Sequence, residues 1–237
     1  MKMLSGTCGE NVIWTLDGGG TLTISGASEM EEYNTFAKDR APWFERRDLI
    51  KKIVIADGVT KIGMLAFEYC ANLTEVKIPD SVAEIDWYAF LGCAGLTEIK
   101  IPASVAEIGD GAFSLCANLR EINIPDGIER IGEDMFSDCA SLAEIKIPDS
   151  VTHIGKFSFD GCTSLTTIKL PDRLTRIDYC AFFECTNLVE IKIPASVVYL
   201  DEEIFEGCTS LKKIYYKAGS GFEEKLSQGN DAELIPY

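Results

Sequence analysis

Apolar residues recur along the chain with a fixed period of 23 residues, and three columns of identical residues define that period. Each period contains a phenylalanine, a cysteine three residues later and a leucine three residues after the cysteine. The columns are Phe67, Phe90, Phe113, Phe136, Phe159, Phe182 and Phe205; Cys70, Cys93, Cys116, Cys139, Cys162, Cys185 and Cys208; and Leu73, Leu96, Leu119, Leu142, Leu165, Leu188 and Leu211. A register kept in three columns indicates an internal structural repeat.

Each period predicts a short strand. After Leu73, the apolar residues Val76 and Ile78 alternate with the charged residues Glu75 and Lys77. This alternation is typical of a strand with one buried face. Proline then ends the strand in six periods, at Pro79, Pro102, Pro125, Pro148, Pro171 and Pro194.

The second half of each period predicts another extended segment and a turn. Val82 and Ile85 begin the extended segment, and Gly or Asp follows at a position that suits a turn. One coil of 23 residues cannot bury its apolar face alone, so successive coils must stack at about 4.8 Å. The predicted fold is a mainly β repeat solenoid with short turns or helical pieces and a parallel sheet on one side.

The full unit reads C-x-x-L-x-x-I-x-I-P-x-x-V-x-x-I-G-x-x-A-F-x-x, and over residues 41–216 it resembles the BspA-like class of leucine-rich repeat proteins. It departs from the general leucine-rich pattern because proline follows the strand and cysteine precedes the leucine. The resemblance implies display on a bacterial surface, or secretion, and adhesion to molecules of a host or a neighbouring cell. Because a fold does not determine a function, this implication is an analogy.

Both ends of such a stack need a cover, since they expose apolar side chains and a strand edge. We expect residues 1–40 to form an N-terminal β-hairpin cap, in which Trp14 and Leu16 alternate with polar residues before a glycine-rich turn. Residues 41–216 are expected to form about seven to eight coils. Residues 217–237 are expected to form a C-terminal cap, with a helical candidate over residues 220–228 and a closing segment over residues 232–236.

The charge and composition disfavour several classes of function. A formal net charge of −16 opposes binding to nucleic acid. His153 is the single histidine, which disfavours histidine-based metal sites and relays, and we expect no metal or cofactor. No run of about 18 apolar residues predicts a membrane span, and the first residues do not resemble an export signal. We expect a monomer without membrane insertion.

The cysteines have several possible roles. Side chains stacked about 4.8 Å apart lie beyond the roughly 3.5–4.5 Å between Cβ atoms that a disulfide prefers, so the repeated thiols are expected to be buried and free. Cys180 occupies a variable column that we expect to be exposed, where it could be a reactive thiol, although no basic residue adjoins it. Cys8 could pair with a residue of the cap that the sequence does not identify.

Two charged columns follow the predicted sheet. They comprise Glu75, Glu98, Glu121, Glu144 and Glu190, and Lys77, Lys100, Lys146, Lys169 and Lys192. Paired carboxylates could support acid–base hydrolysis. Their recurrence in many coils instead favours a solvated face with alternating cross-strand charges. His153 shares a column with polar residues and is expected at the surface.

Apolar residues interrupt the polar pattern around the A-F turn in two places. The early patch comprises Met64, Leu65, Tyr69, Trp87, Tyr88 and Leu91, and the late patch comprises Phe157, Tyr179 and Phe183. Exposed apolar patches commonly mark contact sites. For the early patch, an equally good alternative is that the N-terminal cap or residues 27–40 cover it.

These observations predict a non-catalytic binding module that presents an extended surface to a protein or glycan. An intracellular scaffold or regulatory repeat protein is the main alternative, because abundant unpaired thiols are typical of reducing compartments. A hydrolase that uses acidic residues of the sheet is a third possibility.

Overall fold

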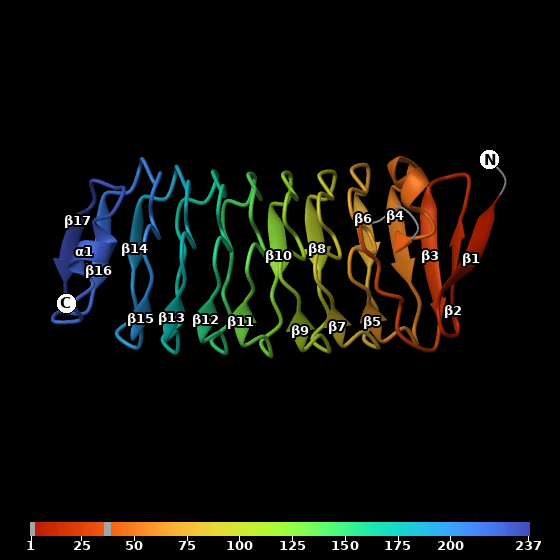
Figure 1. The fold of residues 1–237 in the computed structure, drawn as a ribbon, viewed down its shortest axis with the longest axis horizontal. Helices are drawn as coiled ribbons and strands as arrows, with labels where there is room; N and C mark the ends of the chain where they lie inside the picture. The colour runs from red at the N-terminus through yellow and green to blue at the C-terminus, as the bar shows by residue number, and fades with distance from the viewer. Residues whose placement is uncertain (1–2, 36–38) are drawn as a thin grey trace.

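The computed structural model describes residues 3–35 and 39–237, and the chain forms an elongated stack of coils (Figure 1). Successive coils follow one another along the long axis from the N-terminal to the C-terminal end. Each coil has three sides, which we call the strand side, the second side and the turn side. The 23-residue spacing and the mainly β solenoid predicted from the sequence are confirmed.

The strand side carries parallel strands in register, with Glu98 opposite Glu121 and Ile99 opposite Ile122. The ladder is interrupted, because the hydrogen-bonded sheets are β1-β2-β3-β4-β6, β8-β10 and β14-β16-β17. Between the last two sheets, Lys146 and Lys169 form an isolated bridge. The strands of the repeat are β4 (Lys52–Ile55), β6 (Glu75–Lys77), β8 (Glu98–Lys100), β10 (Glu121–Asn123), β14 (Glu190–Lys192) and β16 (Lys213–Tyr216).

The second side carries shorter parallel strands of two residues each, which form the lower row in Figure 1. Each of these strands begins with a polar residue and ends with a buried Ile or Leu. They form the sheets β5-β7-β9 and β11-β12-β13-β15. Their bounds are β5 (Lys61–Ile62), β7 (Glu84–Ile85), β9 (Glu107–Ile108), β11 (Arg130–Ile131), β12 (His153–Ile154), β13 (Arg176–Ile177) and β15 (Tyr199–Leu200).

The turn side is also hydrogen-bonded from coil to coil. The backbone N–H of Phe67 donates to the carbonyl of Ala89 at 2.9 Å, and the N–H of Phe90 donates to the carbonyl of Ala112 at 2.9 Å. The chain reaches these contacts through two left-handed backbone positions in each coil, such as Leu65 (φ 56°) and Tyr69 (φ 54°). Backbone hydrogen bonds therefore link neighbouring coils on all three sides.

The core is a column of stacked phenylalanine rings. Neighbouring ring centroids lie between 5.2 and 5.9 Å apart. Trp43 extends the column at its N-terminal end, because its ring stacks on Phe67 at 5.8 Å and its Nε1–H donates to the carbonyl of Ala66 at 2.8 Å. The first, degenerate coil thus uses a tryptophan where later coils use a phenylalanine.

The cysteine column lies beside the phenylalanine column and is fully buried. From Cys93 onward, each thiol donates a hydrogen bond of 3.1–3.3 Å to the phenylalanine carbonyl of the preceding coil. The cysteine is therefore both a small apolar filler and a donor that links two coils.

The N-terminal segment forms a three-stranded antiparallel meander that joins the repeat sheet. It consists of β1 (Leu4–Gly9), β2 (Val12–Leu16) and β3 (Thr21–Gly26), and β3 pairs with β4 in parallel. The pattern of Trp14 and Leu16 predicted the β2–β3 hairpin, but the glycine-rich β1 was not predicted. A 3₁₀ helix, η2 (Phe44–Leu49), leads into β4.

The C-terminal end closes the stack with one helical turn and a strand. Helix α1 (Glu223–Leu226) is shorter than the candidate over residues 220–228, and it buries Leu226. Strand β17 (Glu233–Pro236) pairs in parallel with β16. The division into a cap, a solenoid and a second cap stays a proposal.

We expect Phe136→Ala to lower the free energy of unfolding by about 3–5 kcal/mol, because it opens a cavity in a column that packs on both sides. Urea unfolding followed by circular dichroism measures this loss. As a control, Val198→Ala removes methyl groups from a side chain that is 78% exposed and should cost less than about 0.5 kcal/mol. Equal losses in the two variants would contradict the proposed role of the ring column.

Candidate binding surfaces

The early patch lies on the turn side of two adjacent coils. Its outermost members are Trp87 and Tyr69, which are 53% and 44% exposed. Met64, Tyr88 and Leu91 are half-buried. Leu65 is buried and does not form part of the accessible surface.

The aromatic rings of the early patch lie against glycines of the next coil. A Cβ atom on Gly111 would lie 2.0 Å from Tyr88 Cε1, and one on Gly109 would lie 2.4 Å from Trp87 Cδ1. Tyr69 covers Gly92 in the same way, at 2.5 Å. The glycines therefore make room for the rings, because any larger residue at these positions would meet them.

Residues 29–33 are hydrogen-bonded to one end of the early patch. The N–H of Met30 donates to the carbonyl of Lys61 at 3.2 Å, and the N–H of Tyr33 donates to the carbonyl of Met64 at 3.0 Å. Residues 29–33 thus run beside the end of the early patch that contains the buried Leu65. Trp87 and Tyr69 stay accessible in the described structure.

The late patch is smaller and more polar at its edge. The rings of Phe157 and Tyr179 meet edge to face with centroids 5.5 Å apart, and the Tyr179 hydroxyl donates to Glu203. Phe183 is half-buried, as are the other two members. This hydrogen bond stabilises the protonated phenol and raises the pKa of Tyr179.

The expectation that Cys180 is exposed is wrong. Its side chain is 2% exposed, and its backbone has a left-handed conformation with φ 52°. Burial raises the pKa of the Cys180 thiol to about 11, so little reactive thiolate forms near neutral pH. Cys8 is also buried as a free thiol, and its pKa is raised to about 12.

Carboxylates crowd the turn side near the late patch. Burial, together with the nearby charges of Asp138, Glu184 and Asp134, raises the pKa of Asp160 to about 6. Burial and the charges of Glu133 and Asp110 also raise the pKa of Asp134. A partly buried cluster of like charges of this kind destabilises the fold when it is ionised.

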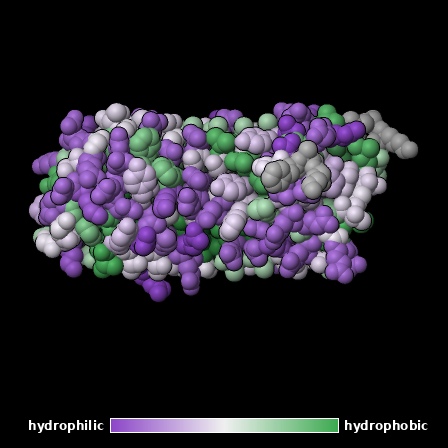
Figure 2. All heavy atoms as spheres, in the orientation of Figure 1, coloured by the Kyte–Doolittle hydropathy of each residue, from purple (hydrophilic) through white to green (hydrophobic). Residues whose placement is uncertain are grey.

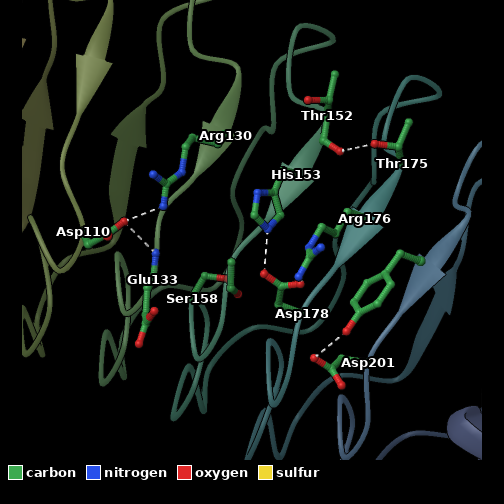
Figure 3. A network of polar contacts seen from close by, with 12 residues as sticks. Asp110, Arg130, Glu133, Thr152, His153, Ser158, Thr175, Arg176, Asp178 and Asp201 are labelled. Carbon is green, nitrogen blue, oxygen red and sulfur yellow. Dashed lines mark hydrogen bonds and ion pairs between the residues drawn. The ribbon is translucent and has the colours of Figure 1, made fainter.

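The single histidine belongs to a polar network on the second side (Figure 3). His153 is partly exposed, and its Nε2 lies 2.7 Å from Oδ2 of the buried Asp178. Arg176 Nε donates to the other oxygen of Asp178 at 2.5 Å. Asp178 therefore accepts from Arg176 of its own coil with one oxygen and contacts His153 of the preceding coil with the other. Figure 3 shows a similar contact one coil further towards the N-terminus, where Arg130 donates to Asp110 at 2.7 Å.

The charged columns on the strand side differ from the expectation of alternating cross-strand charges. The parallel register places Glu98 directly opposite Glu121, so the alternation of sign runs along each strand rather than across strands. In the described part of the chain, ion pairs on this side join Lys52 and Lys77 to Glu75, whereas Lys146, Lys169 and Lys192 form none.

Two of the hollows on the strand side lie where the ladder is interrupted. The larger has a volume of about 750 Å³ and is lined by Glu98, Lys100, Arg120, Asn123 and Glu144, among others. The smaller, about 400 Å³, lies between residues 167–172 and residues 190–194 and also touches Tyr215. We call the smaller one the lysine hollow, because Lys169 and Lys192 stand at its rim.

The surface seen in Figure 2 is mostly hydrophilic, with hydrophobic residues in small separate groups. Within residues 3–35 and 39–237, no three His, Cys, Asp or Glu side chains are grouped so that they could hold a metal ion. None of the helices described there is long and apolar enough to span a bilayer.

Comparisons with known proteins agree with this architecture. A family model described as "BspA type Leucine rich repeat region", with six copies of the repeat, matches residues 41–155 and 129–224. No curated protein matches the sequence.

Several solved structures share the fold at 22% sequence identity. A leucine-rich repeat protein from Bacteroides ovatus has a TM-score of 0.57, with 95% of this chain and 76% of that chain covered. A leucine rich cell surface protein from Faecalibacterium prausnitzii has a TM-score of 0.50, with 99% and 94% covered. A leucine rich repeat protein from T. pallidum has a TM-score of 0.50, with 94% and 97% covered.

We expect Asp160→Asn to raise the free energy of unfolding at pH 7.5. The pKa of Asp160 lies near 6 in the folded protein and at its ordinary value of 3.8 in the unfolded chain. The ionised carboxylate therefore opposes folding above about pH 6, and this penalty disappears as the pH falls through 6 towards 3.8.

Urea midpoints at pH 7.5 and pH 4 measure this effect, with the exposed Asp126→Asn as the control for the removal of one negative charge. The advantage of Asp160→Asn over the control should be present at pH 7.5 and absent at pH 4. A destabilised Asp160→Asn variant at pH 7.5 would refute the assignment.

Proposed function

The chain belongs to the BspA-type leucine-rich repeat family, and we propose that it is a non-catalytic binding module that presents the outer surface of its solenoid to a protein or glycan. The observation that carries this proposal is the early patch, where Trp87 and Tyr69 are exposed on rigid coils. Aromatic residues are enriched among the residues that dominate binding energy at interfaces. The glycines of the next coil leave space in which these rings lie against the backbone.

The polar groups that could support hydrolysis are engaged in structural contacts. His153 and Arg176 both bind Asp178, which is buried. The glutamates of the strand side repeat from coil to coil in register, as Glu98 and Glu121 do, and this arrangement does not single out one catalytic pair. These contacts favour a binding role over an acid–base role.

We propose that the site of action is the cell surface or the extracellular medium. The relative from Faecalibacterium prausnitzii is described as a cell surface protein, and this description supports the proposal. For a protein at this location, the role we propose is adhesion to a molecule of a host or a neighbouring cell. The net charge of −16 opposes binding to nucleic acid.

A second candidate is an intracellular scaffold, and the nine free cysteines favour it. Unpaired thiols are typical of reducing compartments. Their burial weakens this argument, however, because a thiol that is buried and bonded to a backbone carbonyl, as Cys93 is, is also protected from oxidants.

Binding should depend on the exposed aromatic rings. We expect Trp87→Ala/Tyr88→Ala to lose at least about tenfold in affinity for a ligand found in a label-free screen of extracellular-matrix proteins and glycans, since truncation of such anchors typically costs about 2 kcal/mol or more. Val189→Ala/Val198→Ala removes exposed apolar groups elsewhere and should bind like the parent protein. A ligand held equally well by both variants would place the site outside the early patch.

Location is tested by protease treatment of intact producing cells. We expect an added protease that cannot cross the membrane to degrade the protein while a cytoplasmic marker enzyme survives. Protection of the protein until the cells are lysed would support the intracellular scaffold instead.

A further inference from the structure

The lysine hollow has a rim that bears both signs of charge. Ile168, Leu170 and Ile191 also line it, although their side chains are buried and belong to the core. The rim carries two cations, Lys169 and Lys192. The remaining polar groups at the rim are Thr167, Asp172, Glu190 and Tyr215. A volume of about 400 Å³ is within the range of small-ligand sites, which is about 300–1,000 Å³.

Within the residues that the structure describes, the lysines at this hollow are not neutralised by a carboxylate, although Lys192 lies over the Tyr237 ring. In the described part of the chain, neither Lys169 nor Lys192 forms an ion pair, although the chain as a whole has an excess of 16 negative charges. Thr167 stands where the neighbouring coils carry Glu144 and Glu190, so the carboxylate that would adjoin Lys169 is missing. The lining therefore carries two cations, Lys169 and Lys192, against two carboxylates, and Lys169 has no glutamate beside it on its own strand.

Tyrosine rings border the same hollow. Tyr215 is half-buried and lies opposite Lys192 in the β14–β16 pair. Tyr237 lies beneath the Lys192 ammonium, which is 4.4 Å from the ring centroid, and its hydroxyl donates to the carbonyl of Ile193 at 2.7 Å. Burial and the nearby charge of Asp172 raise the pKa of Tyr237, which agrees with a ring close to the Asp172 side of the hollow.

We propose that the lysine hollow is a binding site for a carboxylated saccharide, such as one that contains uronic acid residues. The ammonium groups of Lys169 and Lys192 bind the sugar carboxylate through charge-assisted hydrogen bonds. The tyrosine ring of Tyr215 offers an apolar face to the C–H groups of the sugar ring.

The mixed charge of the rim favours a saccharide over an acidic peptide. Asp172 and Glu190 accept hydrogen bonds but cannot donate them when ionised. Sugar hydroxyls donate to such groups, whereas the side chains of an acidic peptide are ionised carboxylates that have no proton to donate. The hollow thus matches a ligand that carries one carboxylate and several hydroxyls on each unit. This site is separate from the early patch, and its existence does not depend on the function proposed for that patch.

The test is isothermal titration calorimetry of the full chain with a galacturonic acid trisaccharide. We expect saturable binding that weakens as salt is added, since the main contacts are ionic. Lys169→Gln/Lys192→Gln should weaken it at least about tenfold, which corresponds to 1.4 kcal/mol. Lys77→Gln/Lys100→Gln removes the same charge from the same column two coils away or more, and it should bind like the parent protein.

Three further measurements complete the test. The neutral galactose trisaccharide should bind at least about tenfold more weakly, and a tetraglutamate peptide should also bind more weakly than the acidic sugar. Trp87→Ala/Tyr88→Ala should bind the acidic sugar normally, so a failure of the early patch does not affect this result. The proposal would be overturned by any of four results. These are absence of binding, equal binding of the neutral sugar, tighter binding of the peptide, or a loss of affinity in the Lys77→Gln/Lys100→Gln control.

Discussion

The stacking of each coil on the last in strict register is the constraint on which the rest of this structure depends. Hydrogen bonds on three sides fix the offset, so every inward position must suit the same position one coil away. The carbonyl of Phe67 illustrates how closely the atoms are matched, because it accepts both the N–H of Cys70 at 3.3 Å and the thiol of Cys93 at 3.2 Å. A residue that lacks a small donor would leave this buried carbonyl with one partner instead of two. Repeated cysteine follows from this requirement.

The same register imposes two left-handed backbone positions on every coil. Gly111 and Gly161 meet this demand without strain, but Tyr69, Tyr88 and Phe157 meet it with large side chains. A left-handed conformation costs a non-glycine residue roughly 1–2 kcal/mol. Aromatic residues at these positions therefore oppose the local preference of the backbone. Non-glycine residues such as Leu115, Asp134 and Glu184 occupy other positions of this kind, so the left-handed backbone is a property of the fold and does not single out the early patch.

The period of the core columns was enough to predict the solenoid, the buried thiols and the place of both aromatic patches on the turn. It could not predict the features that depend on contacts between unlike segments. Residues 29–33 have no repeat pattern, yet they run beside β5 and bond to the backbone of Lys61 and Met64. Cys180 was expected to be exposed because its column varies, but the next coil buries it, with Glu202 accepting its N–H at 3.3 Å. A variable column shows that many side chains fit there, and it does not show that the position is open to solvent.

Register also explains where recognition surfaces can arise on the strand side. Parallel in-register strands must place like charges side by side, as Glu98 and Glu121 do, and this arrangement is unfavourable. Substitutions relieve the repulsion at the ends of the ladders. Asn123 interrupts the lysine column, and its amide bonds both the N–H and the carbonyl of Ile101, at 2.9 and 2.8 Å. Thr167 interrupts the glutamate column. Both hollows lie beside these interruptions, so in this solenoid the departures from the repeat, rather than the repeat itself, create the places where a ligand can be held.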